Sequence, residues 1–202
     1  MAFEAEAATA VCEWLESHAD HVVNVCAGPR REHWFNAEAF VALSHKARID
    51  KFVVYGEQSY STVLRGTAFL VDSVDGKKLP DIVGFTGDDI DFVIEGKVIL
   101  RSDSDAQRKT TLWKLRDQVE RAKRCSSSCA ALGVAYLIST AGANVAPEPF
   151  YQSVKSDLEA VLNGLAWRWL RAPAGLDGLR LRTTSFDFPV MTISVGIAVF
   201  AL

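Results

Sequence analysis

Asp81, Glu95 and Lys97 are the side chains of this chain whose types and spacing most clearly predict chemistry. Residues 79–85 and 91–100 are rich in β-branched and aromatic side chains, and a short polar turn separates them. Such a pattern predicts two antiparallel strands joined as a hairpin. Because side chains alternate along a strand, Glu95 and Lys97 share one face of the second strand.

The register of this hairpin decides whether Asp81 joins that pair. If residues 87–89 form the loop, Thr86 pairs with Ile90 and Asp81 lies directly opposite Glu95. Opposed side chains on one face have Cβ atoms about 5 Å apart. Two carboxylates that close repel each other unless a cation lies between them. Magnesium, or manganese, suits such a site, and the adjacent lysine indicates metal-assisted attack of water on a phosphodiester.

At these residues a family resemblance appears. Pro80-Asp81, a gap of 13 residues and then Glu95-Gly96-Lys97 resemble the PD-(D/E)xK motif of the restriction-endonuclease-like nucleases. The resemblance implies that Asp81 and Glu95 are metal ligands and that Lys97 is the catalytic lysine. Family members often carry a further metal-binding acid on the first core helix, for which Glu38 is the first candidate and Glu32 the second.

The resemblance also implies a fold, namely an α/β restriction-endonuclease-like core with a central mixed β-sheet flanked by helices. Its elements follow the order helix, three strands, helix, strand (αβββαβ). The sequence pattern fits that order through a helix from Asn36 to about Lys46, strands at 51–56 and 62–74, the motif hairpin, a helix from Ser104 to about Leu132, and a strand at 134–139. Gly133 is expected to end the long helix.

The C-terminal part predicts a further helix and strands. Residues 150–171 have helical periodicity, residues 179–183 favour a strand, and 190–202 are an apolar run typical of a buried strand. That last strand could also pair with a second subunit, which predicts a possible homodimer. We expect one domain over 1–202, with an N-terminal helical extension at 1–29, the nuclease-like core at 30–140 and a C-terminal extension at 141–202.

Basic residues concentrate on the long helix. Residues 101–124 hold eight basic and four acidic side chains, although the whole chain carries a net charge of −3. Four of its residues fall on one stripe of the helix: Lys109, Trp113, Arg116 and Lys123. This stripe could follow the backbone of a nucleic acid, DNA rather than RNA. Trp113 would then stack on a base or pack inward. The alternative is a solvated face with ion pairs such as Asp117 with Arg121.

Composition limits the remaining classes of function. The 202 residues are 49% apolar, which predicts a substantial core and excludes a disordered chain. No run approaches the ~18 uncharged apolar residues of a membrane span, so we expect no membrane partner. Acids occupy the N-terminus, where a signal peptide would carry positive charge, so a cytoplasmic protein is expected.

Three functional classes follow from these patterns, one of them an interaction protein whose C-terminal strand docks on a partner. The first is a magnesium-dependent nuclease that acts through Asp81, Glu95 and Lys97. The alternative is a catalytically inactive protein of the same fold that binds nucleic acid or a regulatory partner. At the residue level, Asp81 could instead cap the turn after Pro80, with Glu95 and Lys97 as an exposed ion pair. In the exonuclease-like subgroup, a glutamine on the long helix precedes a tyrosine by four residues, whereas here Gln118 precedes Ala122.

Overall fold

A mixed β-sheet forms the centre of the molecule. The computed structural model describes residues 3–18, 22, 31–50, 53–56, 80–86, 89–125, 129–142, 146–165, 167–171, 179–185 and 188–202. Its strands are β1 (Val53–Gly56), β2 (Ile82–Thr86), β3 (Asp89–Leu100), β4 (Ala130–Gly142), β5 (Trp167–Arg171), β6 (Leu179–Ser185) and β7 (Phe188–Ala201). The seven strands follow the order β1-β2-β3-β4-β7-β5, and β6 also pairs with β7. Only β3 and β4 run parallel to each other among these pairs.

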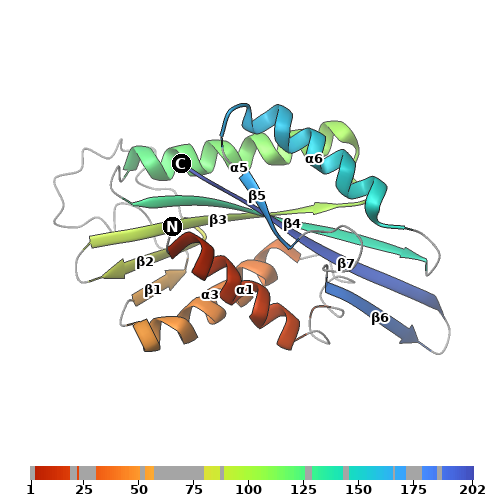
Figure 1. Ribbon diagram of the computed structural model, residues 1–202, viewed down its shortest axis with the longest axis horizontal. Coiled ribbons are helices and arrows are strands. Elements are labelled where there is room, and N and C mark those ends of the chain that lie inside the picture. The colour runs from red at the N-terminus through yellow and green to blue at the C-terminus, as the bar shows by residue number, and fades with distance from the viewer. Residues whose placement is uncertain are drawn as a thin grey trace.

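Helices cover both faces of this sheet. The helices are α1 (Phe3–Ser17), α3 (Arg31–Asp50), α5 (Asp105–Cys125) and α6 (Glu148–Leu162). Helices α1 and α3 lie on one side of the sheet, and α5 and α6 lie on the other (Figure 1). From α3 to β4 the described elements follow the order helix, three strands, helix, strand. The predicted α/β class, a mixed sheet flanked by helices, is therefore confirmed.

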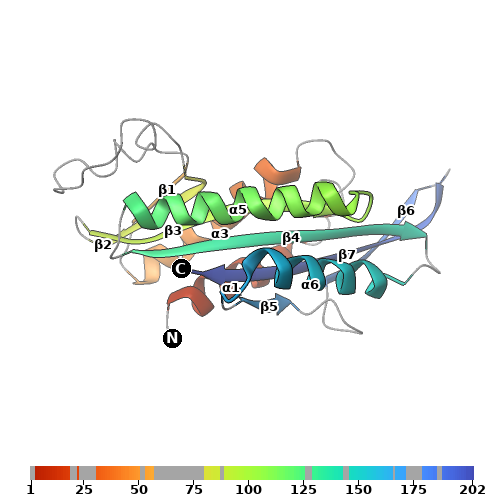
Figure 2. The same ribbon diagram turned by 90° about the horizontal axis from the view of Figure 1, so that it is seen from above.

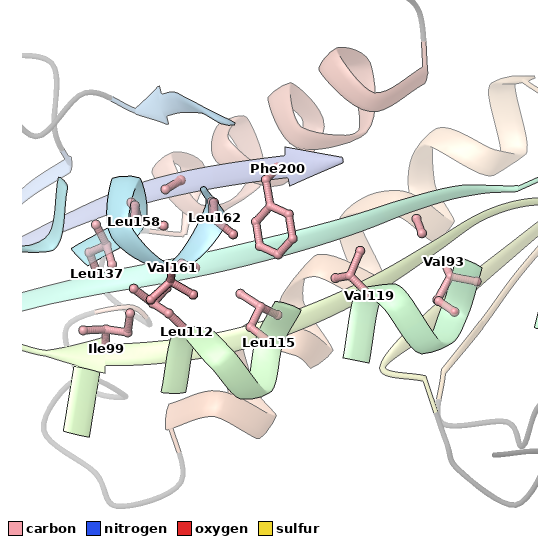
Figure 3. Packing of buried hydrophobic residues seen from close by; sticks show 14 of the residues in the cluster. Val93, Ile99, Leu112, Leu115, Val119, Leu137, Leu158, Val161, Leu162 and Phe200 are labelled. Atoms are coloured by element: carbon pink, nitrogen blue, oxygen red, sulfur yellow. The ribbon is translucent and has the colours of Figure 1, made fainter. Parts of the chain in front are cut away.

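Alternation along β3 divides the core into two layers. Phe92 and Ile94 pack toward α1 and α3, while Val93 and Ile99 pack toward α5 and α6. The second layer is completed by Leu112, Leu115 and Val119 of α5, Leu158, Val161 and Leu162 of α6, Leu137 of β4 and Phe200 of β7 (Figure 3). Because β3 is covered on both faces, a charged residue within it requires a polar partner.

Two boundaries of the predicted core differ in the structure. Helix α3 begins at Arg31, not at Asn36, so Asn36 lies inside the helix instead of capping it. Helix α5 ends at Cys125, and β4 begins at Ala130, so the predicted helix to Leu132 was too long. Gly133 ends no helix, because it pairs with Phe200 on β7, and a Cβ at Gly133 would lie 2.3 Å from the Phe200 ring. The small residue makes room for that ring.

The predicted helix over 150–171 was also too long. Helix α6 ends at Leu162, and Gly164 adopts a φ of 90°, a left-handed conformation that interrupts a helix. The chain then continues as β5, which pairs with β7. The predicted strand at 62–74 lies outside the described residues.

Strand β7 explains the apolar C-terminal run. It pairs with β4 from Met191 to Ala201 on one side, and with β5 and β6 on the other. A second subunit cannot add to an edge that is already paired, so the predicted dimer route through this strand is wrong, while the homodimer itself stays a prediction. Among the described residues, no helix is long and apolar enough to cross a membrane.

Candidate active site

The β2–β3 hairpin brings Asp81 next to Glu95. The last recorded pair of this ladder is Ile82 with Ile94, and the same register carried one residue further puts Asp81 opposite Glu95, the position that the sequence predicts. The predicted pairing of Thr86 with Ile90 was wrong, because Thr86 pairs with Asp89. The difference is absorbed by an irregularity after Gly84, which leaves one extra residue on β3. The bulge lies toward the turn and does not disturb the register at the motif.

Asp81 lies immediately before β2 and is partly buried. Its Oδ2 accepts a hydrogen bond of 2.7 Å from the backbone nitrogen of Gly96. Gly96 is beyond the last residue of β3 that pairs with β2, so the carboxylate takes the place of a strand acceptor. This bond fixes the orientation of Asp81 relative to the Glu95-Gly96-Lys97 segment.

Gly96 packs closely against Asn36 of α3. A Cβ at this position would lie 2.1 Å from Oδ1 of Asn36 and 3.1 Å from the ring of Tyr136. Real Cβ atoms do not approach other atoms this closely, so any side chain here would displace α3 or its Asn36. The glycine therefore leaves room for the Asn36 side chain between α3 and β3.

Glu95 is the most buried charged residue of the candidate site, with 0% exposure. Its side chain lies on the face of the sheet that α5 covers, where Nε2 of Gln118 donates a hydrogen bond of 3.1 Å to Oε2. The other polar atom of that amide, Oε1 of Gln118, is buried and has no hydrogen-bond partner among the described residues. A buried acceptor without a partner costs about 1–3 kcal/mol. The site thus contains an acceptor suited to a ligand or a water.

Lys97 forms an ion pair with α3. Its Nζ lies 2.6 Å from Oε1 of Glu32, and the two side chains are partly exposed. The ion pair joins the third residue of the motif to the first turn of α3. Of the two acids that the sequence suggested on this helix, the structure thus brings Glu32, and not Glu38, to the motif.

Glu38 lies in the contact between α1 and α3. Its Oε2 accepts a hydrogen bond from Nε1 of Trp14, and the Trp14 ring stacks on His18 and His45 with centroid distances of 4.1 and 5.0 Å. In the described part of the chain, no three His, Cys, Asp or Glu side chains gather into a group that could hold a metal. The acids available at the motif are therefore Asp81, Glu95 and the lysine-bound Glu32.

The predicted basic stripe lies on the α6 side of α5. Arg116 donates to Glu120 and to the carbonyl of Val161. Lys109 Nζ lies 3.7 Å from a carboxylate oxygen of Asp157, and Lys123 donates a hydrogen bond to the carbonyl of Cys129. Trp113 is 53% exposed and lies beside the Arg116 guanidinium. Much of the positive charge of this stripe is engaged within the protein.

An open cleft lies on the opposite flank of α5. It has a volume of about 530 Å³ and extends from the first turn of α3, past the end of β3, to α5. Its lining includes Glu32, Gln107, Thr111 and Lys114. Since Glu32 also holds Lys97, the cleft opens directly beside the motif.

Sequence reasoning took Asn36 only as the start of a helix and gave Lys114 no role, and it noted Gln118 only as half of an incomplete pattern. The available signal was the spacing of Gln107, Thr111, Lys114 and Gln118, which recur on one flank of a helix. This flank is less basic than the predicted stripe, so a search for clustered positive charge did not single it out. Comparisons of the chain with protein-family models, curated proteins and solved structures find no match.

Proposed function

We propose that this protein is a divalent-metal-dependent nuclease that hydrolyses the phosphodiester bonds of DNA rather than RNA. The observation that carries the proposal is the pairing of Ile82 with Ile94, which brings Asp81 opposite the buried Glu95 with Lys97 two residues further along β3. The order of the described elements from α3 to β4 supports the resemblance to the restriction-endonuclease-like nucleases, because Asp81 immediately precedes the second described strand of this series and Glu95 and Lys97 lie on the third.

The donor set fits magnesium or manganese. Asp81 and Glu95 supply carboxylate oxygens, and magnesium in proteins is commonly held by one or two carboxylates with waters completing its shell. The buried Oε1 of Gln118, which has no partner among the described residues, can accept a hydrogen bond from a water in the same place. When bound, the cation would activate water and stabilise negative charge on the phosphate oxygens.

Protein groups orient the reacting parts. The Gly96 nitrogen fixes Asp81, and the Gln118 amide fixes Glu95. The Lys97 ammonium, which has only hydrogen-bond donors, stabilises negative charge on the phosphate and orients the attacking water through its lone pair. In hydrolysis the water oxygen bonds to phosphorus, the bond from phosphorus to the leaving oxygen breaks, and that oxygen ends with a proton.

A second candidate is a nucleic-acid-binding or regulatory protein that retains this arrangement without hydrolysis. The ion pair of Lys97 with Glu32 favours it, because a lysine held at 2.6 Å by a carboxylate is partly neutralised. This candidate predicts binding that magnesium does not change.

Cleavage assays separate the two candidates. Duplex DNA, single-stranded DNA and RNA would each be incubated with wild type and with Lys97→Met, in magnesium, manganese or EDTA. The nuclease proposal predicts cleavage of DNA by the wild type that EDTA abolishes and that Lys97→Met lacks, at unchanged thermal stability. Absence of metal-dependent cleavage on every substrate, together with binding that magnesium does not affect, would contradict the nuclease and support the second candidate.

A further inference from the structure

The cleft beside the motif differs from the predicted basic stripe in how its charges are engaged. Lys114 lies at its α5 wall, is exposed, and has no ion-pair or hydrogen-bond partner among the described residues. The acids of the cleft are already engaged, since Glu32 holds Lys97 and Oδ2 of Asp103 accepts from the Leu100 nitrogen. Neither acid is paired with Lys114, whose positive charge therefore faces an open space.

The other walls of the cleft fit a nucleotide. Val98 and Leu100 of β3 provide an apolar floor, while Gln107 and Thr111 add an amide and a hydroxyl along the α5 wall. A volume of about 530 Å³ falls within the range of small-molecule sites, so it suits a nucleotide of one strand better than a whole base pair. A simple anion would need no apolar floor, whereas a sugar and a base present apolar faces next to a phosphate.

Helix α5 connects this cleft to the buried carboxylate. Gln107, Thr111, Lys114 and Gln118 lie along one flank of the helix, and the last of them donates to Glu95. Figure 2 shows how α5 runs along the sheet, so that one flank follows it over several turns. A strand that occupies the cleft would therefore be directed toward the site of hydrolysis.

We propose that this cleft binds a single nucleic-acid strand next to the bond that is cut, with Lys114 contacting a backbone phosphate. The position of the cut bond rests on the proposed function, whereas binding in the cleft does not. The surface that engages nucleic acid is then the flank of α5 with Lys114, and not the flank with Lys109, Arg116 and Lys123.

Binding of a fluorescein-labelled single-stranded DNA of about 12 nucleotides tests the proposal. Anisotropy would be measured over a range of salt concentrations, in EDTA and again in calcium, so that no hydrolysis is required. Lys114→Ala is expected to weaken binding about three- to tenfold and to reduce the salt slope by about 0.7, the value for one phosphate contact on a single strand. Lys114→Arg, which keeps the charge, should retain the affinity.

Charge-matched variants complete the design. Lys155→Ala removes another exposed lysine, on α6, and should leave affinity within about twofold of the wild type. Lys109→Ala tests the opposite flank and should weaken binding less than Lys114→Ala. The same titrations would be made with a duplex of that length. The proposal is overturned if Lys114→Ala binds like the wild type, if Lys109→Ala shows the larger loss, if the Lys114 effect appears only with the duplex, or if neither the single strand nor the duplex binds.

These outcomes are independent of catalysis. Binding that depends on Lys114 in a protein that does not cleave would keep this inference and reject the proposed nuclease. Cleavage by the wild type with no effect of Lys114→Ala on affinity or KM would keep the nuclease and reject the cleft as its strand-binding surface.

Discussion

Gly96, the residue between Glu95 and Lys97, contacts the two neighbouring elements that complete the candidate site. Its nitrogen donates to Asp81, and its missing side chain leaves room for Asn36 of α3. A glycine at this position therefore has a packing reason, since it leaves room for Asn36 on the same helix whose Glu32 lies 2.6 Å from Lys97. Gly96 therefore contacts both Asp81, which precedes β2, and helix α3.

Gly96→Ala is expected to destabilise the protein by about 1–3 kcal/mol, because the new methyl group overlaps Oδ1 of Asn36. Asn36→Ala removes that atom and should recover part of the loss in the double variant. Urea unfolding of the four proteins in a double-mutant cycle measures the coupling, expected to exceed about 0.5 kcal/mol. Additive effects of the two substitutions would contradict the close contact.

At this scale, sequence spacing predicted the side chains of the motif better than it predicted their partners. Asp81, Glu95 and Lys97 could be placed together because strand pairing has a fixed period. Gln118, Glu32 and Asn36 could not be chosen among their neighbours, because the rotation and distance of α3 and α5 depend on packing against the whole sheet.

One flank of helix α5 packs against α6, and the other borders the cleft. On the α6 side, the buried Arg108 bonds Asp157 at 2.8 Å and Asp105 at 2.6 Å. Burial alone would lower the pKa of Arg108, but the hydrogen bonds and charges of Asp157 and Asp105 outweigh it and raise the pKa above its ordinary value. This cluster joins α5 to α6, whereas the other flank borders the cleft.

Asp157→Ala is expected to destabilise the protein by about 3–5 kcal/mol, since it removes one partner of a buried ion pair. A group with a raised pKa contributes stability below its unfolded-state pKa and loses it only as the pH rises through the folded-state value. Arg108 is charged throughout the ordinary range, so the loss should be the same at pH ~7 and pH ~10. Thermal and urea unfolding measure it.

Lys155→Ala is the matched control on α6. Its ion pair with Glu159 spans 3.9 Å between exposed side chains, so the substitution should change stability by less than about 0.5 kcal/mol. An Asp157→Ala effect no larger than that of Lys155→Ala would show that the Arg108 cluster does not hold the two helices together.

Helical periodicity predicted α5 and α6 as elements but not where they end. Leu112, Leu115 and Val119 repeat at helical spacing and are all buried. The alanine-rich stretch that opens β4 has no period of its own, and it becomes a strand because β3 and β7 provide hydrogen-bond partners on both sides.

At the scale of the whole molecule, β7 holds the sheet together. It connects β4 to β5 and β6, and its residues contribute to both core layers. The apolar run at the C-terminus is therefore an interior strand, which its length and composition predicted, while its neighbours could not be known before the topology.

Removal of residues 188–202 should abolish cooperative unfolding, because β4 loses one partner and both layers lose side chains. Circular dichroism during urea titration is the measurement, and Ile197→Val, expected to cost about 0.5–1.5 kcal/mol, is the mild control. A truncated chain that still unfolds in one sharp transition would contradict the central place of β7.

The central claim is that Asp81, opposite Glu95, takes part in metal-dependent cleavage. Its most direct test compares magnesium-dependent cleavage of DNA by wild type, Asp81→Asn and Asp91→Asn, where Asp91 is an exposed acid on the same hairpin. Replacing a residue that only hydrogen-bonds to a metal ligand typically lowers activity about 10–100-fold. Replacing the ligand itself should cost more, so Asp81→Asn should lower the cleavage rate by more than that, while Asp91→Asn cleaves like the wild type. Equal cleavage by Asp81→Asn and the wild type, at equal purity and stability, would contradict the account.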